Sequence, residues 1–340
     1  MSPVPAPAKA LVTGANGYIA AWVVRTLLEQ GYSVLGTVRS ASKGEHLKKI
    51  FASYGDKFGI AVVEDITQPG AFDEVVKDVD LVEHTASPFH MNGKTPSDLI
   101  DPAVRGTTGI LESIKKSGSS VRRVVITSST AAVQYPVPSY TVFDEYSWDE
   151  HAIEEVKAKG DATAAAFVYR ASKTMAEKAA WEFVKTHNPS WDLVVLNPPF
   201  VFGPPIHEVS SLSALNTSMQ TMYDTLVKGA KDTEALAAPA GSWIDVRDVA
   251  RAHALAAQVA EAGGNRIIIS AGAFFWQDVV DAAVDNGDEP AVKGLYGATK
   301  GKRSVVNYNT AKAGKILGME YNSLHNMTRD VMAYFKEFSS

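Results

Sequence analysis

Seven short runs of apolar, mostly β-branched residues recur along the chain and alternate with segments long enough to be amphipathic helices. The runs cover residues 10–13, 34–38, 60–63, 81–84, 124–127, 193–196 and 266–269. Nearly all lack polar alternation, and strands that are apolar on both faces belong to a parallel sheet covered by helices on each side. The intervening lengths suit right-handed crossovers. The pattern therefore predicts an α/β fold with a doubly wound parallel Rossmann sheet.

The remaining segments predict helices and a second lobe. Helices are expected at residues 18–29, 71–77, 99–116, 169–185, 246–260 and 276–285. A long insertion, 200–242, separates the sixth strand from the seventh, and a tail, 274–340, follows the seventh. We expect the insertion and the tail to form a smaller substrate-binding lobe, and residues 1–199 and 243–273 to form the sheet domain.

Composition restricts the class of protein. The 340 residues are 46% hydrophobic, which is ordinary for a soluble globular chain. The formal net charge is −5 and no basic block stands out, so nucleic acid is not an expected partner. There are no cysteines and the eight histidines show no metal-ligand spacing, so no metal is expected. No secretory signal and no apolar stretch of roughly 20 residues occurs, which predicts a cytoplasmic protein without a membrane span.

A glycine loop follows the first strand and opens the first helix. It reads Thr13-Gly14-Ala15-Asn16-Gly17-Tyr18-Ile19-Ala20. The two glycines allow a tight turn, and the small residue that ends the motif allows the helix to pack closely on the sheet, so that the helix N-terminus faces a pyrophosphate. Its place between strand and helix favours a dinucleotide site. We assign that site to Gly14, Asn16, Gly17, Tyr18 and Ile19.

The end of the second strand lacks the acidic residue that usually holds the ribose hydroxyls of NAD. It reads Thr37-Val38-Arg39-Ser40-Ala41-Ser42-Lys43, and its two cations can form charge-assisted hydrogen bonds to a 2′-phosphate. We therefore predict that Arg39 and Lys43 select NADPH/NADP⁺ and that the sheet domain is an NADP-binding domain. The alternative is that both cations are solvated surface residues.

Other strand ends supply further cofactor candidates, because open α/β sheets bind ligands beyond the carboxyl ends of their strands. Asp65 and Ile66 follow the third strand and could hold the adenine amine. Thr85, Ala86 and Ser87 follow the fourth strand and could line the central part of the cofactor. Thr127, which ends the fifth strand, belongs to the same set.

Tyr169 and Lys173 carry the strongest indication of chemistry. They lie four residues apart in Phe167-Val168-Tyr169-Arg170-Ala171-Ser172-Lys173, so on a helix they share one face. A neighbouring ammonium favours the phenolate and is expected to lower the pKa of the phenol from about 10. Such a phenol can protonate a carbonyl oxygen. The alternative is an ordinary core-facing tyrosine.

The same spacing occurs twice more, at Tyr296/Lys300 and Tyr308/Lys312. Three glycines around Tyr296 predict a loop with no shared helical face. In the other copy Asn309 has the character of a helix N-cap, so its tyrosine would precede the helix. Only Tyr169 opens a long amphipathic pattern downstream of a strand that ends in serines.

Read together, these motifs resemble those of the extended short-chain dehydrogenase/reductases over most of the chain. The strings that carry the likeness, besides the glycine loop and the serine, tyrosine and lysine, include Asn197-Pro198-Pro199-Phe200-Val201-Phe202-Gly203-Pro204. Three more strings are similar to those of the dihydroflavonol-reductase-like branch, and within it of yeast and fungal NADPH-dependent aldehyde, ketone and methylglyoxal reductases. They begin at Thr85, Ala176 and Trp243.

The resemblance implies roles for individual residues. Ser129 would be the catalytic serine, Tyr169 the acid, and Lys173 the residue that holds the nicotinamide ribose and tunes Tyr169. Pro198 and Val201 would flank the nicotinamide, and Ser218 would reach the cofactor. The chain lacks the Asn-Trp-Tyr-Cys-Tyr signature of cinnamoyl-CoA reductases around its tyrosine, which disfavours a CoA thioester substrate.

The predicted activity is NADPH-dependent reduction of ketones or aldehydes, with a tyrosine as proton donor and a serine as hydrogen-bond donor to the oxygen. Mostly apolar residues near the expected carbonyl indicate a small-molecule substrate that is hydrophobic and of modest size: Phe89, Thr130, Val133, Phe167 and Phe200. Core packing is an equally weighted alternative for Val133 and Phe167. No arginine or lysine pair obviously awaits a carboxylate or phosphate.

Two other functions stay open at this point. One is a sugar-nucleotide epimerase or dehydratase on the same fold, which would keep and recycle its nicotinamide. The other is a non-catalytic NADP-sensing protein, although the serine, tyrosine and lysine are all present. The sequence does not determine the preferred carbonyl compound, the product stereochemistry, the physiological direction or the oligomeric state.

Overall fold

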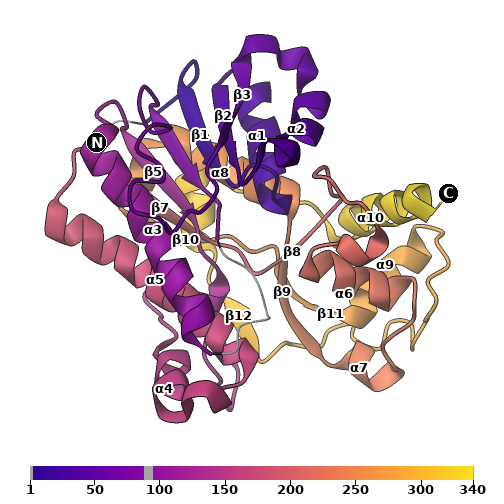
Figure 1. Cartoon of the computed structure of the whole chain (residues 1–340). Helices are drawn as coiled ribbons and strands as arrows, with labels where there is room; N and C mark the ends of the chain where they lie inside the picture. The colour runs from indigo at the N-terminus through magenta and orange to yellow at the C-terminus, as the bar shows by residue number, and fades with distance from the viewer. Residues whose placement is uncertain (1–2, 88–94, 340) are drawn as a thin grey trace.

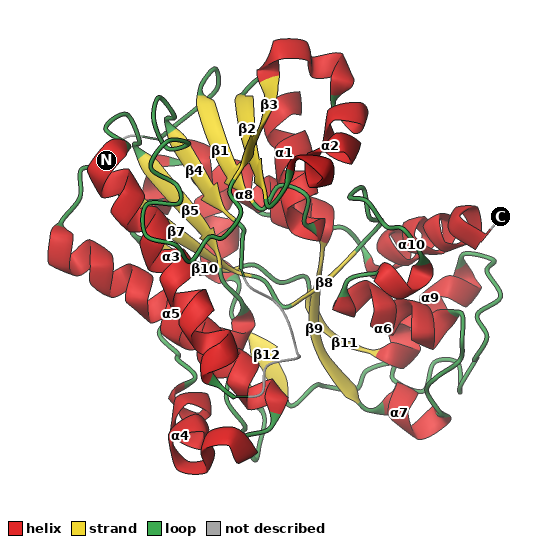
Figure 2. Ribbon diagram, in the orientation of Figure 1, coloured by secondary structure: helices red, strands yellow, loops and turns green. Residues whose placement is uncertain are grey.

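The computed structural model describes residues 3–87 and 95–339. Its centre is a seven-stranded sheet with helices on both faces (Figures 1 and 2), and every strand pair in it is parallel. In spatial order the strands are β3 (Phe58–Val62), β2 (Ser33–Val38), β1 (Lys9–Thr13), β4 (Leu81–His84), β5 (Arg123–Thr127), β7 (Asp192–Asn197) and β10 (Asn265–Ile268). The predicted doubly wound Rossmann sheet is confirmed.

Side chains that alternate along β1 enter two different cores. Ala10 and Val12 pack in the core that includes α1 (Tyr18–Glu29) and α8 (Val246–Gln258). Leu11 points the other way, into the core that includes residues of α3 (Ser97–Ser117) and α5 (Ala165–His187). Both faces of the strand are therefore buried, which explains why the strand has no polar alternation.

The order of the strands reverses between β1 and β4, which are neighbours although β2 and β3 lie between them in sequence. Loops that leave these two strands diverge to opposite sides of the sheet. In sheets of this kind a ligand crevice opens at this point, beyond the carboxyl ends of the strands.

A smaller sheet lies beyond that edge. It consists of β8 (Phe200–Phe202), β9 (Pro239–Asp245) and β11 (Gly272–Phe275), with β8 parallel and β11 antiparallel to β9. Figure 1 shows four helices grouped near it: α6 (Thr217–Leu226), α7 (Thr233–Ala237), α9 (Trp276–Asp285) and α10 (Leu324–Ser339). A separate parallel pair joins β6 (Thr141–Phe143) to β12 (Val306–Tyr308).

Two strands cross the expected boundary between the sheet domain and the smaller lobe. The strand β9 runs across the expected boundary at residue 243, and β12 of the tail pairs with β6 of the first segment. The division into an NADP-binding domain and a lobe of residues 200–242 and 274–340 stays a prediction.

The predicted helix at 71–77 is wrong. This segment forms successive turns, in which the amide of Val75 donates to the carbonyl of Phe72. Gly70 and Asp78, at its two ends, both have positive φ, and seven residues between such ends are too few to stabilise a helix by themselves.

Several observed helices were missed. They are α2 (Glu45–Ile50), α4 (Glu150–Lys159), α6, α7 and α10. For α4 a local sequence signal existed, since the Asp149 side chain caps the helix by accepting from the Ala152 amide at 3.0 Å. Within residues 3–87 and 95–339, no helix has both the length and the apolar character that crossing a membrane requires.

Candidate active site

Ser129, Tyr169 and Lys173 lie together at the carboxyl edge of the main sheet. Ser129 follows β5 and caps a short 3₁₀ turn, where its Oγ accepts from the Ala131 amide at 3.0 Å. Tyr169 and Lys173 lie one turn apart on α5. The side chain of Tyr169 is hydrogen-bonded to Ser129, and Lys173 Nζ lies 5.9 Å from the centre of the tyrosine ring. The three residues form one cluster, and their catalytic roles remain predictions.

The other two tyrosine–lysine pairs lie in different surroundings. Tyr296 is on a turn, 63% exposed, and its hydroxyl donates to Asp285 at 2.7 Å. Tyr308 lies in β12, before the helical turn that contains Lys312. Neither pair shares a helical face, so identical spacing produces a paired phenol and ammonium only on α5.

The pKa of Tyr169 lies above its usual value, contrary to the lowered pKa expected from the sequence. Burial has the largest effect and raises the pKa, while the hydrogen bond with Ser129 lowers it. The ammonium of Lys173 is directed to the hydroxyl of Ser87, with Nζ and Oγ 3.3 Å apart. The expectation was therefore wrong, because desolvation of the phenolate outweighs the hydrogen bond with Ser129. A neutral phenol is nevertheless the form that can donate a proton.

Lys173 is half-buried, and desolvation lowers the pKa of its ammonium to about 8, with Glu177 acting in the opposite direction. The charged form of Lys173 favours the phenolate that remains after proton donation. Because this charge is lost as pH rises through about 8, we expect kcat/KM for carbonyl reduction to fall on the alkaline side of that pH.

A pH profile of kcat/KM tests this expectation. The variant Lys173→Arg, whose guanidinium stays protonated at every pH of the assay, should move the alkaline limb to higher pH even where its absolute rate is low. The same limb in both proteins would show that Lys173 does not set it.

A buried carboxylate lies behind the cluster. Glu177, one helical turn beyond the lysine, is 2% exposed. Its Oε2 accepts from Ser128 Oγ at 2.6 Å and from Asn197 Nδ2 at 2.8 Å, and its Oε1 accepts from Arg266 Nε at 2.6 Å. Asn197 Nδ2 also donates to the backbone carbonyl of Ser129 at 3.1 Å. Sequence reasoning missed this arrangement, although a second step of four residues beyond the lysine was available as a signal.

Arg266 supplies the countercharge for this carboxylate from β10. Its guanidinium lies 3.5 Å from the centre of the Trp148 ring, and Nη1 donates to the carbonyls of Glu145 and Ser147, each at 2.9 Å. The ion pair therefore joins α5 and β10 to the segment before α4. This set of charged hydrogen bonds holds the backbone near the site, although Arg266 Nη2 is buried without a hydrogen-bond partner among the described residues.

The glycine loop fits a dinucleotide. Gly14 has φ +65°, and a Cβ placed there would lie 3.1 Å from the Cβ of Ala86, so a side chain would strain the turn. Gly17 is the N-cap of α1, and no side chain caps this helix end. The amides at the helix N-terminus can thus face a pyrophosphate, which is the chemistry expected of this loop.

The other loop residues differ in exposure. Asn16 and Ile19 are half-buried, whereas Tyr18 is buried with its hydroxyl donating to the carbonyl of Gly203 at 2.7 Å. The hydroxyl of Tyr18 therefore joins the first helix to the segment after β8. Its expected contact with the cofactor stays a prediction.

Arg39 and Lys43 are both exposed, just beyond β2. Arg39 lies near Asp65 and contributes to the lowered pKa of that carboxyl, although hydrogen bonds from Thr67 contribute more. Asp65 Oδ1 accepts from the Thr67 amide at 2.8 Å and hydroxyl at 2.7 Å. Ile66, beside it, is half-buried. These four predicted residues thus lie on loops beyond adjacent strands β2 and β3.

The loop after β4 is tied to the end of β1 by two threonine hydroxyls. Thr13 Oγ1 accepts from the amides of Thr85 at 3.2 Å and Ala86 at 3.0 Å, and the Thr85 hydroxyl donates back to the Thr13 carbonyl. Thr85, Ala86 and Ser87 are half-buried. This crosslink holds the predicted cofactor segment at the switch point of the sheet.

Thr127 contacts a buried histidine that the sequence analysis did not identify. Its Oγ1 lies 2.9 Å from His253 Nε2, and His253 Nδ1 lies 2.6 Å from Glu83 Oε2. Neither His253 nor Glu83 has any exposed surface. The chain of contacts runs from the interior of the sheet to its carboxyl edge and orients Thr127 there.

Pro198 follows β7, Val201 lies in β8, and Ser218 lies in α6. Ser218 Oγ donates to the carbonyl of Val201 at 2.6 Å and accepts from Asn216 Nδ2 at 2.9 Å. Pro198 and Val201 are buried, and Ser218 is half-buried. Ser218 is therefore hydrogen-bonded to Val201. Contact of Pro198, Val201 and Ser218 with a cofactor stays a prediction.

The residues predicted to contact the substrate differ in exposure and in what surrounds them. Phe200 is 47% exposed, and Thr130 is buried next to Ser129. Val133 is fully buried with Phe143 and Ile268, and Phe167 packs against a small core at the start of α5, which favours core packing for both. Phe89 lies outside the described residues. Within the described part of the chain, no group of three potential metal-ligating side chains occurs.

Comparison with known proteins decides the family. Residues 10–272 match the sequence model of the NAD dependent epimerase/dehydratase family. The chain belongs to this family. A ketoreductase of Aspergillus niger is 38% identical, over 97% of this chain and 98% of the relative. An NADPH-dependent methylglyoxal reductase of Saccharomyces cerevisiae is also 38% identical, over 96% of this chain and 98% of the relative.

Solved structures agree with these relatives. The crystal structure of yeast methylglyoxal/isovaleraldehyde reductase complexed with NADPH superposes with a TM-score of 0.85 at 36% identity, covering 97% of this chain and 99% of that one. The resemblance to extended short-chain reductases inferred from the motifs is confirmed. In this epimerase/dehydratase family member, the cluster on α5 and the glycine loop lie at the same edge of the sheet.

Proposed function

We propose that the protein is an NADPH-dependent carbonyl reductase that converts ketones and aldehydes to alcohols. The observation that carries the proposal is the Ser129–Tyr169–Lys173 cluster at the carboxyl edge of a sheet whose first helix is opened by an uncapped glycine turn. The relatives from Aspergillus and Saccharomyces, described as a ketoreductase and an NADPH-dependent reductase, support it. A cytoplasmic location, expected from the sequence, belongs to the same proposal.

Each residue of the cluster has one task in this mechanism. A bound reduced nicotinamide supplies the hydride. Tyr169 donates its phenolic proton to the substrate oxygen, and Ser129 donates a hydrogen bond to the same oxygen, where negative charge develops. Lys173 stabilises the phenolate that remains. Glu177 and Asn197 hold the backbone of Ser129 while this occurs.

A panel of ketones and aldehydes, followed by cofactor absorbance with NADPH and NADH in parallel, tests the function. We expect stoichiometric NADPH oxidation with simple carbonyl compounds and a higher kcat/KM with NADPH than with NADH. A sugar-nucleotide epimerase would recycle its nicotinamide and consume none, and a sensing protein would bind without turnover. Either result would overturn the proposal.

The cofactor preference depends on two exposed cations in the proposed site. Replacing Arg39 and Lys43 together with alanine should raise the KM for NADPH about tenfold or more and leave that for NADH nearly unchanged, because charge-assisted bonds to the 2′-phosphate are lost. Lys57→Ala, which removes an exposed cation just before β3, at the opposite end of the strands, is the control. An unchanged NADPH to NADH ratio in the double variant would assign the phosphate to other residues.

A further inference from the structure

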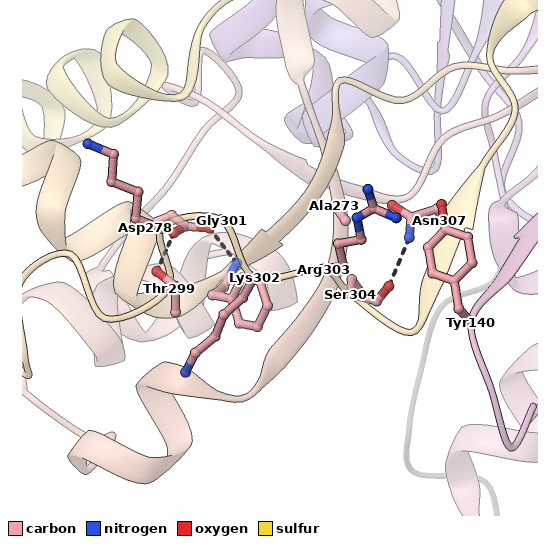
Figure 3. A pocket seen from close by; sticks show the side chains of 11 residues that line it. Tyr140, Ala273, Asp278, Thr299, Gly301, Lys302, Arg303, Ser304 and Asn307 are labelled. Atoms are coloured by element: carbon pink, nitrogen blue, oxygen red, sulfur yellow. Dashed lines mark hydrogen bonds between the residues drawn. The ribbon is translucent and has the colours of Figure 1, made fainter.

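A polar pocket of about 470 Å³ lies between the β6–β12 pair and the end of β11 (Figure 3). Lys300, Lys302 and Arg303 line it from the loop before β12, and Figure 3 shows the side chain of Lys302 directed away from Arg303. Among the described residues, none that lines the pocket belongs to the cluster around Tyr169. The pocket is therefore separate from the proposed reaction. A different set of polar groups adjoins the proposed site directly, at the end of β5.

Glu83, His253 and Thr127 form a line of polar groups from the interior of the sheet to its carboxyl edge. His253, on α8, lies between the other two, with Nδ1 2.6 Å from Glu83 Oε2 and Nε2 2.9 Å from Thr127 Oγ1. Glu83 and His253 have no exposed surface, whereas Thr127 is half-buried. Because the hydrogen bond at one ring nitrogen fixes the state of the other, the carboxyl group controls how the histidine meets the hydroxyl.

The Glu83–His253 pair has no countercharge beyond itself. Within the described part of the chain, the Glu83 side chain is hydrogen-bonded to His253 alone, and its Oε1 is buried without a partner. The cation Arg123 acts on Glu83 electrostatically, but it is already bound to Asp192 through hydrogen bonds of 2.7 and 2.8 Å. A carboxylate beside a neutral imidazole would leave one net negative charge in the interior, which is costly. The pair is therefore neutral overall.

Both neutral forms of the pair place a proton on His253 Nε2. If the carboxyl group is ionised, the ring is an imidazolium and both of its nitrogens carry protons. If the carboxyl group is protonated, it donates to Nδ1, and the neutral ring keeps its proton on Nε2. In either form Nε2 donates to Thr127 Oγ1, so the histidine does not use the hydroxyl proton of Thr127. That proton has no other acceptor among the residues that the structure describes.

The sheet places Thr127 beside the proposed cofactor site. Ile126, the residue before it, pairs with His84 of β4, so Thr127 lies level with the start of the loop that begins at Thr85. This loop is proposed to line the cofactor, and Ser129 follows Thr127 by two residues. A hydroxyl proton that no protein group accepts is here available to an oxygen atom of a bound dinucleotide.

We propose that Glu83 and His253 are positioning residues that make the Thr127 hydroxyl a hydrogen-bond donor to an oxygen atom of bound NADPH. The proposal rests on the proposed function and adds to it two buried residues behind the cofactor site. Because Thr127 Oγ1 accepts from Nε2, the hydroxyl is held in one orientation and its own proton is left for the cofactor. A histidine with an unprotonated Nε2 would have the opposite effect, since it would take up that proton itself.

Fluorescence titration with NADPH, in the absence of a carbonyl compound, tests the donor role of Thr127. Thr127→Val, which replaces the hydroxyl with a methyl group, should raise the Kd for NADPH about fivefold or more, because one hydrogen bond is lost. Thr127→Ser, which keeps the hydroxyl, should bind NADPH like the wild type. Equal Kd values for the valine variant and the wild type would overturn the proposal. A wild-type protein that does not bind NADPH would instead contradict the proposed function.

Nitrogen NMR of the protein with isotopically labelled histidines tests the charge argument without any cofactor. The resonance of an imidazole nitrogen differs widely between its protonated and unprotonated forms, and the resonances of His253 are those that are absent from His253→Gln. We expect Nε2 of His253 to carry a proton at neutral pH. An unprotonated Nε2 would show that Thr127 donates to the ring, and the proposal would then be wrong.

Replacing both buried residues separates positioning from stability. Glu83→Leu/His253→Leu leaves no buried charge without its partner, so the variant is expected to fold. Its Kd for NADPH should rise, and adding Thr127→Val should then have a smaller effect than in the wild type, because the two changes remove one shared contribution. Asp285→Ala/His325→Ala, which removes an exposed carboxylate–histidine pair 3.1 Å apart, should leave the Kd unchanged.

A purely structural pair gives a different result. The free energy of unfolding would then change in Glu83→Leu/His253→Leu while the Kd for NADPH stayed at the wild-type value, and this outcome would overturn the proposal. Should that variant not fold, the titration of Thr127→Val and the NMR measurement on the wild type still decide the question, because neither disturbs the buried pair.

Discussion

Tyr169→Phe is expected to reduce turnover of carbonyl substrates by about 10²-fold or more, since the variant keeps the ring and loses the only proton that the side chain can donate. The hydroxyl is hydrogen-bonded to Ser129 at the edge of the sheet, and the ring lies 5.9 Å from Lys173 Nζ. The loss should appear in kcat and in kcat/KM alike, because the interaction is made in the transition state.

Binding of NADPH, measured by fluorescence titration, should be nearly unchanged in the same variant, because the phenol is proposed to act on the substrate. Tyr296→Phe is a matched control, since it removes a hydroxyl from a tyrosine that also has a lysine four residues on and is 63% exposed. We expect its activity to equal that of the wild type. Wild-type turnover in Tyr169→Phe would remove the basis of the proposed mechanism.

Glu177→Gln is expected to destabilise the protein by about 3 kcal/mol or more, because it leaves the buried guanidinium of Arg266 without its countercharge. The change also replaces a double acceptor with a side chain that carries an NH₂ group. That NH₂ group would face Asn197 Nδ2, which now donates to the carboxylate at 2.8 Å and to the Ser129 carbonyl at 3.1 Å. If the Asn197 amide rotates to relieve the conflict, the backbone carbonyl of Ser129 loses the hydrogen bond from Asn197 Nδ2. The position of Ser129 is then less well fixed, so kcat should fall as well.

Urea denaturation followed by tryptophan fluorescence measures the free energy of unfolding, and steady-state kinetics below the transition measures kcat. Glu182→Gln on the same helix is the control, because that carboxylate is exposed and its ion pair with Lys185 spans 3.7 Å. A change within about 0.5 kcal/mol is expected there. Equal unfolding midpoints for the Glu177 and Glu182 variants would show that the buried network contributes little to stability.

The sheet was predictable from sequence because each strand is apolar on both faces, and this composition has few other stable arrangements. The glycine turn and the α5 pair were predictable for a related reason, since both depend on residues within one turn of the chain. The segment at 71–77 failed because an apolar helical period is compatible with successive turns when Gly70 and Asp78 take positive φ at its ends.

Groups assembled from distant parts of the chain were not predictable. Glu177, Asn197 and Arg266 come from one helix and two strands, and nothing in their local sequence indicates that one carboxylate meets both donors. The pKa of Tyr169 shows the same limit, because its direction depends on how far the phenol is buried and where the Lys173 ammonium points. The sequence shows that a tyrosine and a lysine are present, but it does not show how much desolvation raises the pKa of the phenol.

The sequence by itself determined the α/β sheet, the site of the glycine turn and the presence of a phenol and an ammonium on one helical face, since periodicity and backbone freedom are local properties. Only the tertiary structure decided which strand ends share an edge, which buried charges are paired and that Lys300, Lys302 and Arg303 line one pocket. The physical reason is that burial and charge pairing depend on distances in space, and chain folding sets those distances between residues that are far apart in sequence.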